Sequence, residues 1–185
     1  MGRYRPPEPE KTAVVTAAGF TRLQRELNFL WKEKRPEVTA RVAAAAALGD
    51  RSENADYTYG KRQLAEIDRR IRYLDKRIRV MQVVDRLPSD TSKVYFGAWV
   101  TIVPVVRGDS QTYRLVGPDE IDEAPGYISI DSPMAKALMG KSQGDEIAIM
   151  QTASSTKILS FNDTTEPTRY AIGAIDYQEP RGGRL

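Results

Sequence analysis

A long heptad pattern is the strongest constraint that this sequence places on its own fold. Between residues 54 and 84, apolar or glycine positions recur at alternating spacings of three and four without a break. These positions are Tyr57, Gly60, Leu64, Ile67, Ile71, Leu74, Ile78 and Met81. Such spacing places one apolar stripe along an α-helix, and a stripe of this length is typical of a coiled coil. The sequence therefore predicts a helix over residues 54–84 that packs against a partner helix.

A second helix is predicted before it, over residues 16–48. Thr16 can cap its start, and a run of alanines near its end has the highest helix propensity available. Pro36 lies inside this helix, where proline should kink it or weaken one turn. This helix has its own apolar stripe, which comprises Phe20, Leu23, Leu27 and Leu30 and, after Pro36, Val38, Val42 and Ala45. Because only the short joint Gly49–Ser52 separates the two helices, they have to fold back antiparallel to bury both stripes. The prediction is a thin helical hairpin with little core of its own.

Beyond a linker at Leu87–Asp90 the apolar period changes to two, which is typical of β-strands. Turn residues separate the candidate strands. These strands are Val94–Phe96, Trp99–Val103, Tyr113–Val116, Tyr127–Ile130, Glu146–Met150, Lys157–Phe161 and Tyr170–Ile175. One short helix interrupts them, with Ser132 as its N-cap, Pro133 in its first turn and a stop at Gly140.

Three segments follow from these patterns, and they define an α+β fold class. Residues 1–12, rich in Arg, Pro and Glu, are expected to be a disordered tail without the apolar stretch of a signal peptide. Residues 13–86 are expected to form the antiparallel coiled-coil hairpin, and residues 91–178 a small antiparallel α+β domain. No apolar run approaches the roughly 20 residues that a membrane-spanning helix needs, so we expect a cytoplasmic protein without a membrane partner.

Composition narrows the chemistry that is available to the chain. It has no cysteine and no histidine, which excludes disulfides, thiolate catalysis and Cys-based zinc sites and removes the commonest general base. The net charge of +3 hides an asymmetry. Residues 1–84 carry 18 Lys and Arg against 11 Asp and Glu, whereas residues 85–185 carry 10 against 14. A basic half joined to an acidic half indicates two modules with different partners, although chance clustering on solvated faces is an alternative.

Three acidic residues lie close together where the two predicted helices are joined. They are Asp50, Glu53 and Asp56, within the run Gly49–Tyr57. Asp50 with Glu53 three positions later has the spacing of a capping box, and the helix dipole favours acidic residues at a helix start. Spacing alone therefore favours a capping role over a functional one.

A basic stripe on the second helix supports the functional alternative. Its members recur at spacings of 7, 3, 4 and 3, and they are Arg62, Arg69, Arg72, Lys76 and Arg79. Residues 61–79 carry eight Lys and Arg against three Asp and Glu. Such an excess of positive charge is typical of a surface that binds a polyanion, although a merely solvated face is the alternative. An acidic tip on a basic arm would repel phosphate unless a divalent cation lies between them. Two carboxylates suit Mg²⁺ but would bind it weakly, so another protein has to complete the site.

The run Gly49–Tyr57 resembles the tip motif of the GreA/GreB family of bacterial transcript cleavage factors. Other segments resemble the GreB branch of that family, and they are Ala65–Leu74, Leu27–Trp31, Arg35–Val38, Phe96–Val100 and Tyr127–Ala135. The resemblance covers residues 13 to 177, although Ser154–Thr168 looks like an insertion and both termini are extra. It implies an FKBP-like fold for the C-terminal domain.

The resemblance also implies a function and its partners. The hairpin would enter the secondary channel of bacterial RNA polymerase as an accessory factor, not an enzyme, and Asp50 and Glu53 would help to hold a Mg²⁺ shared with the polymerase active centre. The polymerase would then hydrolyse its own backtracked RNA, and the basic stripe would face the nascent RNA 3′ segment. The tip positions expected to support this role are Ser52, Asn54, Asp56 and Tyr57. The loop expected to dock on the channel rim is Asp131, Ser132 and Pro133. A monomer is expected.

Three other functions stay open at this point. A protein of the same fold could bind polymerase and inhibit or modulate transcription without cleavage. A stand-alone nucleic-acid-binding coiled coil would bind RNA or DNA without polymerase, with an affinity that falls steeply with salt. An FKBP-like domain also suggests a prolyl isomerase, but a fold does not imply a function.

Overall fold

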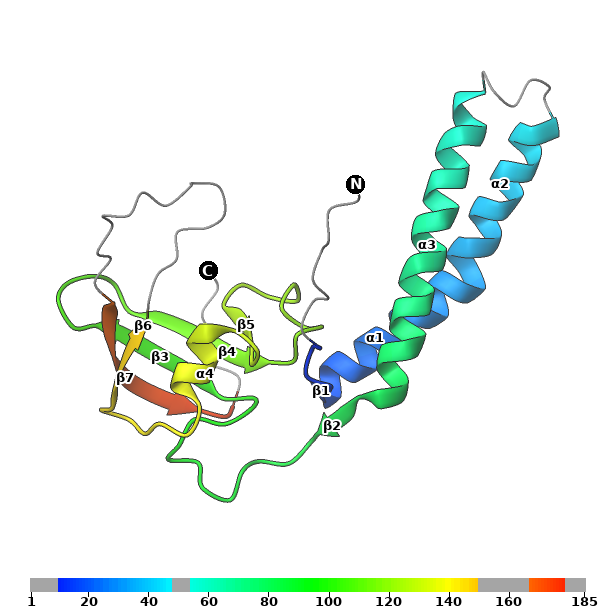
Figure 1. The fold of residues 1–185 in the computed structure, drawn as a ribbon. Helices are drawn as coiled ribbons and strands as arrows, with labels where there is room; N and C mark the ends of the chain where they lie inside the picture. The colour runs from blue at the N-terminus through cyan, green and yellow to red at the C-terminus, as the bar shows by residue number, and fades with distance from the viewer. Residues whose placement is uncertain (1–9, 48–53, 150–166, 179–185) are drawn as a thin grey trace, which may run out of the picture. The chain divides into compact units, whose positions relative to one another are not determined.

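The computed structural model describes residues 10–47, 54–149 and 167–178 (Figure 1). The chain divides into two compact units. One unit is the stretch Ala17–Val83, which is helical. The other joins the residues up to Thr16 to those from Val84 onward, and it contains a β-sheet.

The helical unit is an antiparallel hairpin. Its elements are α1 (Ala17–Phe29), the π-helical turn η1 (Leu30–Lys34), α2 (Arg35–Ala47) and α3 (Ala55–Val80), followed by the short strand β2 (Gln82–Val84). Figure 1 shows α2 and α3 side by side. Contacts between the two arms run in opposite order along the chain, because Asn54 bonds to Ala45 whereas Arg70 bonds to Glu26. The predicted hairpin is therefore confirmed.

A π-helical turn, and not a break, accommodates the proline in the first arm. The backbone N–H of Arg35 donates to the carbonyl of Leu30, which is the five-residue spacing of a π-helix. Pro36 follows directly, and it has no N–H to continue the regular pattern. The wider turn therefore lets one arm run on from α1 to α2, where the sequence predicts a kink or a weakened turn.

The predicted heptad stripe forms the core of the hairpin. The stripe positions buried in α3 are Gly60, Ile67, Ile71 and Leu74. Ile67 and Ile71 pack with Val38 of α2, which is fully buried. Gly60 lets the two arms approach closely, since a Cβ placed there would lie 2.7 Å from a methyl carbon of Val42. Glycine at this position of the stripe is thus a packing requirement.

The second unit is built on a five-stranded sheet. Its elements are β1 (Val14–Thr16), β3 (Trp99–Pro104), β4 (Gln111–Val116), β5 (Tyr127–Ser129), α4 (Pro133–Leu138), β6 (Glu146–Ile149) and β7 (Thr168–Asp176). The sheet order is β5-β4-β3-β7-β6. Buried residues of α4, Ala135 and Leu138, pack on Val100, Ile102 and other apolar residues of one sheet face. The α+β class is confirmed, and Ser132 caps α4 as predicted, accepting from the N–H of Ala135 at 3.2 Å.

Two strand predictions are wrong. The sheet is mixed and not wholly antiparallel, because β4 and β5 run parallel. The turns over residues 117–126 carry the chain back so that β5 starts at the same end as β4. Residues 94–96 form no strand, since Val94 instead exchanges backbone hydrogen bonds with the turn after α4, at Gly140 and Lys141. The predicted strand Lys157–Phe161 lies outside the described residues.

Thr16 directly precedes α1, where the sequence predicts that it caps the helix, and this capping role stays a prediction. It ends β1, and its hydroxyl and its backbone N–H both donate to the carboxylate of Glu120. Glu120 is buried and also accepts from the N–H of Gly117 at 3.0 Å. The chain approaches so closely here that a Cβ at Gly117 would lie 2.2 Å from the carbonyl oxygen of Val14. Strand β1 is therefore held to the loop after β4.

Candidate functional site

The two tip carboxylates of the sequence analysis, Asp50 and Glu53, lie outside the described residues, as does Ser52. The structure describes the chain again from Asn54. Helix α3 begins at Ala55 with Asn54 as its N-cap. The alternative in which Asp50 and Glu53 form the capping box of this helix is therefore wrong, because both residues precede its N-cap.

Asn54 ties the two arms together at the base of the tip. Its side-chain oxygen accepts from the backbone N–H of Tyr57 at 3.1 Å, which satisfies one of the unpaired donors at the start of α3. Its side-chain nitrogen donates to the carbonyl of Ala45 at 3.0 Å, in the last turn of α2. One amide thus completes a helix end on each arm and holds the ends of α2 and α3 together.

The other tip positions differ in exposure. Asp56 is exposed in the first turn of α3, and Tyr57 is half-buried. The ammonium of Lys61 lies 5.3 Å from the centre of the Tyr57 ring, within the range of a cation–π contact. The predicted role of both residues in supporting the tip stays a prediction.

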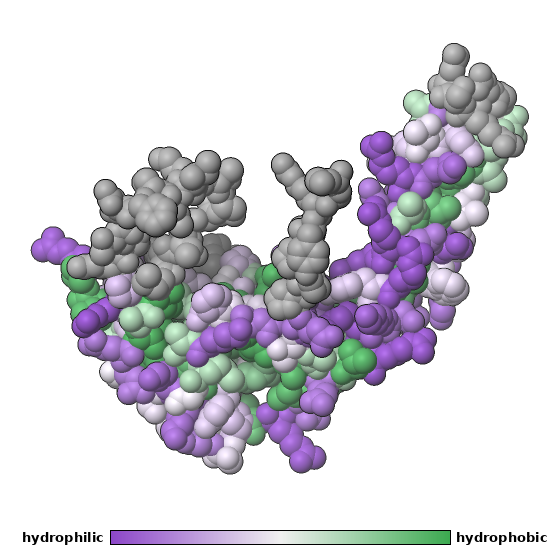
Figure 2. Space-filling view, viewed as in Figure 1, coloured by the Kyte–Doolittle hydropathy of each residue, from purple (hydrophilic) through white to green (hydrophobic). Residues whose placement is uncertain are grey.

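All five residues of the basic stripe, Arg62, Arg69, Arg72, Lys76 and Arg79, are exposed on α3. Arg79 pairs with Asp75 at 3.0 Å. Within the part of the chain that the structure describes, the other four have no ion pair. Figure 2 shows hydrophilic side chains gathered along the hairpin. The structure thus leaves cationic surface on α3 that could bind a polyanion.

Not every cation of this helix is available in that way. Arg70 forms a bidentate pair with Glu26, with nitrogen–oxygen distances of 2.7 and 2.8 Å. Arg35 of the first arm pairs with Asp68 of α3 at 2.8 Å. These bonds join the two arms, and sequence spacing alone could not separate them from the unpaired cations.

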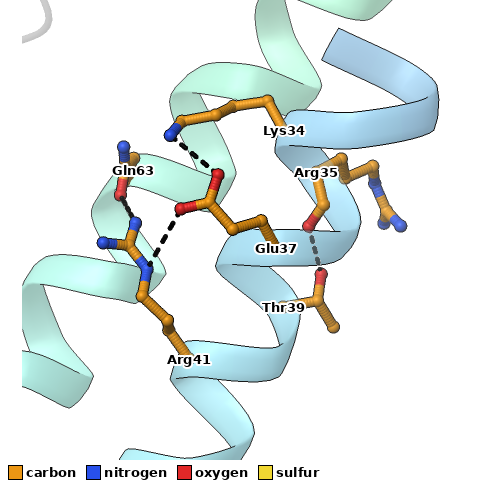
Figure 3. Close-up of polar contacts among 6 residues, drawn as sticks. All are labelled: Lys34, Arg35, Glu37, Thr39, Arg41 and Gln63. Atoms are coloured by element: carbon orange, nitrogen blue, oxygen red, sulfur yellow. Dashed lines mark hydrogen bonds and ion pairs between the residues drawn. The ribbon is translucent and has the colours of Figure 1, made fainter. Parts of the chain in front are cut away.

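A series of polar contacts runs along α2 and reaches α3 at Gln63 (Figure 3). Glu37 accepts a hydrogen bond from Lys34 at 2.9 Å, and Lys34 lowers the pKa of that carboxyl mainly through this bond and its charge. Arg41 lies 4.0 Å from Glu37 and donates to the side-chain oxygen of Gln63 at 2.7 Å. The guanidinium of Arg41 is therefore held between α2 and α3.

A groove of about 380 Å³ adjoins Arg41 toward the end of the hairpin. It is lined by Arg41, Ala44, Ala45, Asp56, Tyr59, Gly60 and Gln63. Sequence reasoning missed it, because it depends on small residues from both arms meeting at one level. Tyr59, an exposed aromatic residue of α3, lines the groove together with Ala44 and Ala45 of the other arm.

The predicted docking loop lies before α4. Ser132 uses its hydroxyl to cap that helix, and Pro133 is exposed in the first turn. The carboxylate of Asp131 accepts from the backbone N–H of Thr12 at 2.9 Å and from the Thr12 hydroxyl. Sequence reasoning missed this contact, because 119 positions separate the two residues.

The described residues contain no group of three or more acidic side chains that could hold a metal ion. In the same residues, no helix is both long enough and apolar enough to cross a membrane.

Comparison with known proteins assigns both units. The family model for the N-terminal domain of transcription elongation factors GreA and GreB matches residues 13–83, and the model for their C-terminal domain matches residues 89–177. A transcription elongation factor GreB of Xanthomonas axonopodis pv. citri is 54% identical over 146 residues, which cover 79% of this chain and 87% of the relative. A second GreB, of Pasteurella multocida, is 54% identical over 152 residues, which cover 82% of this chain and 95% of the relative.

A solved structure, of the transcription elongation factor GreA/GreB of Nitrosomonas europaea, covers 92% of this chain and 100% of its own at 18% identity and a TM-score of 0.39. The assignment rests on the sequence matches. The two family matches, one over the hairpin and one over the mixed-sheet unit, define a two-unit factor of transcription elongation. The chain belongs to the GreA/GreB family of transcription elongation factors.

Proposed function

We propose that this chain is a transcript cleavage factor of bacterial RNA polymerase. Its hairpin enters the secondary channel and stimulates the polymerase to hydrolyse backtracked nascent RNA, which rescues arrested complexes. The family match over both units carries this proposal. The protein acts as an accessory, and the reaction takes place in the polymerase active centre.

In this proposal Asp50 and Glu53 hold a Mg²⁺ together with polymerase ligands. The donor set fits, because both residues supply the carboxylate oxygens that this hard cation prefers. Two carboxylates alone would bind the ion weakly, so polymerase ligands would have to complete the site. When bound, the ion supplies Lewis acidity that lowers the pKa of the attacking water.

The described residues have supporting tasks. Asn54 holds the ends of α2 and α3 together, so that the joint carrying the two carboxylates starts and returns at fixed points. The unpaired cations of the basic stripe attract the phosphates of the extruded RNA 3′ segment. Asp131, Ser132 and Pro133 dock on the rim of the channel.

The proposal is tested by adding the purified protein to a backtracked elongation complex with Mg²⁺ and following RNA length. We expect the RNA to lose a 3′ fragment, and the polymerase then to extend the new end. Binding of the protein without any shortening of the RNA would contradict the proposal and would identify the alternative, a polymerase regulator that does not stimulate cleavage.

A further inference from the structure

Two threonines near the N-terminus bind carboxylates of the globular unit in the same way. Thr12 donates its backbone N–H to one oxygen of Asp131 and its hydroxyl to the other. Thr16 donates its backbone N–H to one oxygen of Glu120, at 3.1 Å, and its hydroxyl to the other. Each of the two threonines, which are four residues apart, therefore donates two hydrogen bonds to one carboxylate. We call these the twin contacts.

The twin contacts differ in burial, and this difference decides how easily each one opens. Glu120 is 1% exposed, so opening its contact would leave a buried carboxylate with fewer donors, which is costly. The Thr12–Asp131 contact is exposed, and water can replace each of its bonds. Thr12 can therefore leave Asp131 while Thr16 and the buried Val15 keep β1 in place.

The docking loop does not need Thr12 to keep its shape. The N–H of Asp131 donates to the hydroxyl oxygen of Ser129 at 3.0 Å, and Ser132 caps α4 through its own hydroxyl. These local bonds hold the loop backbone on both sides of Asp131. The hydrogen bonds from Thr12 instead engage both oxygens of the Asp131 carboxylate.

We propose that Thr12 occupies the docking carboxylate of Asp131 in the free protein, and that polymerase has to displace Thr12 to bind there. The segment 10–12 is thus an intramolecular competitor that lowers the apparent affinity for polymerase. The polymerase group that replaces it has to be a hydrogen-bond donor or a cation, because an ionised carboxylate only accepts. This inference rests on the proposed function, in which Asp131 docks on polymerase.

The test measures equilibrium binding of full-length variants to RNA polymerase. Thr12→Val removes the hydroxyl but keeps the shape, and it should bind roughly threefold more tightly, since occupancy of a site by a competitor lowers its apparent affinity. Thr12→Ser keeps the hydroxyl and should bind like the unmodified protein. Thr16→Val, the same change at the twin contact, should give no gain in affinity.

A second pair of variants separates this inference from the proposed function. Asp131→Ala should weaken binding, and Thr12→Val should have no further effect in that background, because the competitor then has nothing to occupy. If Asp131→Ala weakens binding but Thr12→Val leaves affinity unchanged or lower, the inference is wrong and the docking role stands. If Asp131→Ala binds like the unmodified protein, both the docking role and the inference are wrong. An equal gain in Thr16→Val would also overturn the inference, because general loosening of β1 would explain it.

Discussion

Replacing Asn54 by alanine should loosen the end of the hairpin by an amount that its two hydrogen bonds predict. Losing the N-cap bond to Tyr57 costs about 1 kcal/mol. Losing the half-buried bond to the carbonyl of Ala45 costs about 1 kcal/mol more. The total of about 2 kcal/mol corresponds to roughly 30-fold faster hydrogen exchange where that exchange follows local opening.

The assay is amide hydrogen exchange, read at the first turn of α3. The relevant donors are the N–H groups of Tyr57 and Thr58, which bond to the side chain and the backbone of Asn54. Asn54→Asp is the matched variant, because aspartate caps a helix as well as asparagine but cannot donate to Ala45. We expect its exchange to be roughly fivefold faster than in the unmodified protein, which corresponds to the loss of one bond of about 1 kcal/mol.

Two results would refute this reasoning. One is exchange in Asn54→Ala within threefold of the unmodified protein, which would mean that other contacts hold the two arms together. The other is equal exchange in the Ala and Asp variants, which would mean that capping contributes nothing. In the first case Asn54 would not hold the end of the hairpin, and in the second only its bond to Ala45 would do so.

Three further predictions concern the hairpin. The double variant Arg69→Glu plus Arg72→Glu should weaken the stimulation of cleavage. It should also make the slope of log RNA affinity against log salt concentration shallower, by the amount expected for the loss of about two phosphate contacts. An unchanged slope would contradict this prediction. Gly60→Ala should cost up to about 2 kcal/mol in urea unfolding, because overpacking by the new methyl, 2.7 Å from a methyl carbon of Val42, outweighs the gain of about 1 kcal/mol in helix propensity. A gain in stability would show that Val42 moves aside without cost. The pKa of Glu37 is lowered in the folded protein, so its pair with Lys34 should stabilise the hairpin at pH values above the unfolded-state pKa and lose that effect as pH falls through the folded-state pKa. In Glu37→Gln the thermal unfolding temperature should therefore fall less steeply with decreasing pH. The same dependence of unfolding temperature on pH in both proteins would contradict this prediction.

Local patterns predicted the hairpin well because its core is a repeat that sequence displays directly. The stripe residues Ile67, Ile71 and Leu74 are buried as their spacing predicts. The π-helical turn before Pro36 was not predictable in detail, because proline constrains only its own turn and packing of the whole arm decides how the helix continues.

The sheet was predicted less completely, for a physical reason. Alternation identifies strands, but the parallel pairing of β4 with β5 depends on the path of residues 117–126, which alternation does not encode. The segment 94–96 alternates like a strand, yet Val94 finds its partners in the turn after α4.

Some features of the candidate site were also predictable from local sequence, and others were not. Exposure of the basic stripe follows from helical geometry, and the cap at Ser132 follows from local chemistry. The cap of α3 did not follow, because Asp50, Ser52 and Asn54 are all suitable residue types and only the contact with Ala45 selects Asn54. The contact of Thr12 with Asp131 joins residues far apart in sequence, and no local pattern signals it.

The central claim is that Asp50 and Glu53 act on the ion in the polymerase active centre. It is tested most directly by comparing Asp50→Asn plus Glu53→Gln with the unmodified protein on one backtracked complex, measuring both polymerase affinity and cleavage rate. Asp109→Asn, an exposed acid of the globular unit, serves as the matched control. The proposed mechanism predicts that the double variant keeps its affinity and loses the stimulated cleavage, while the control keeps both. Full cleavage by the double variant would contradict it.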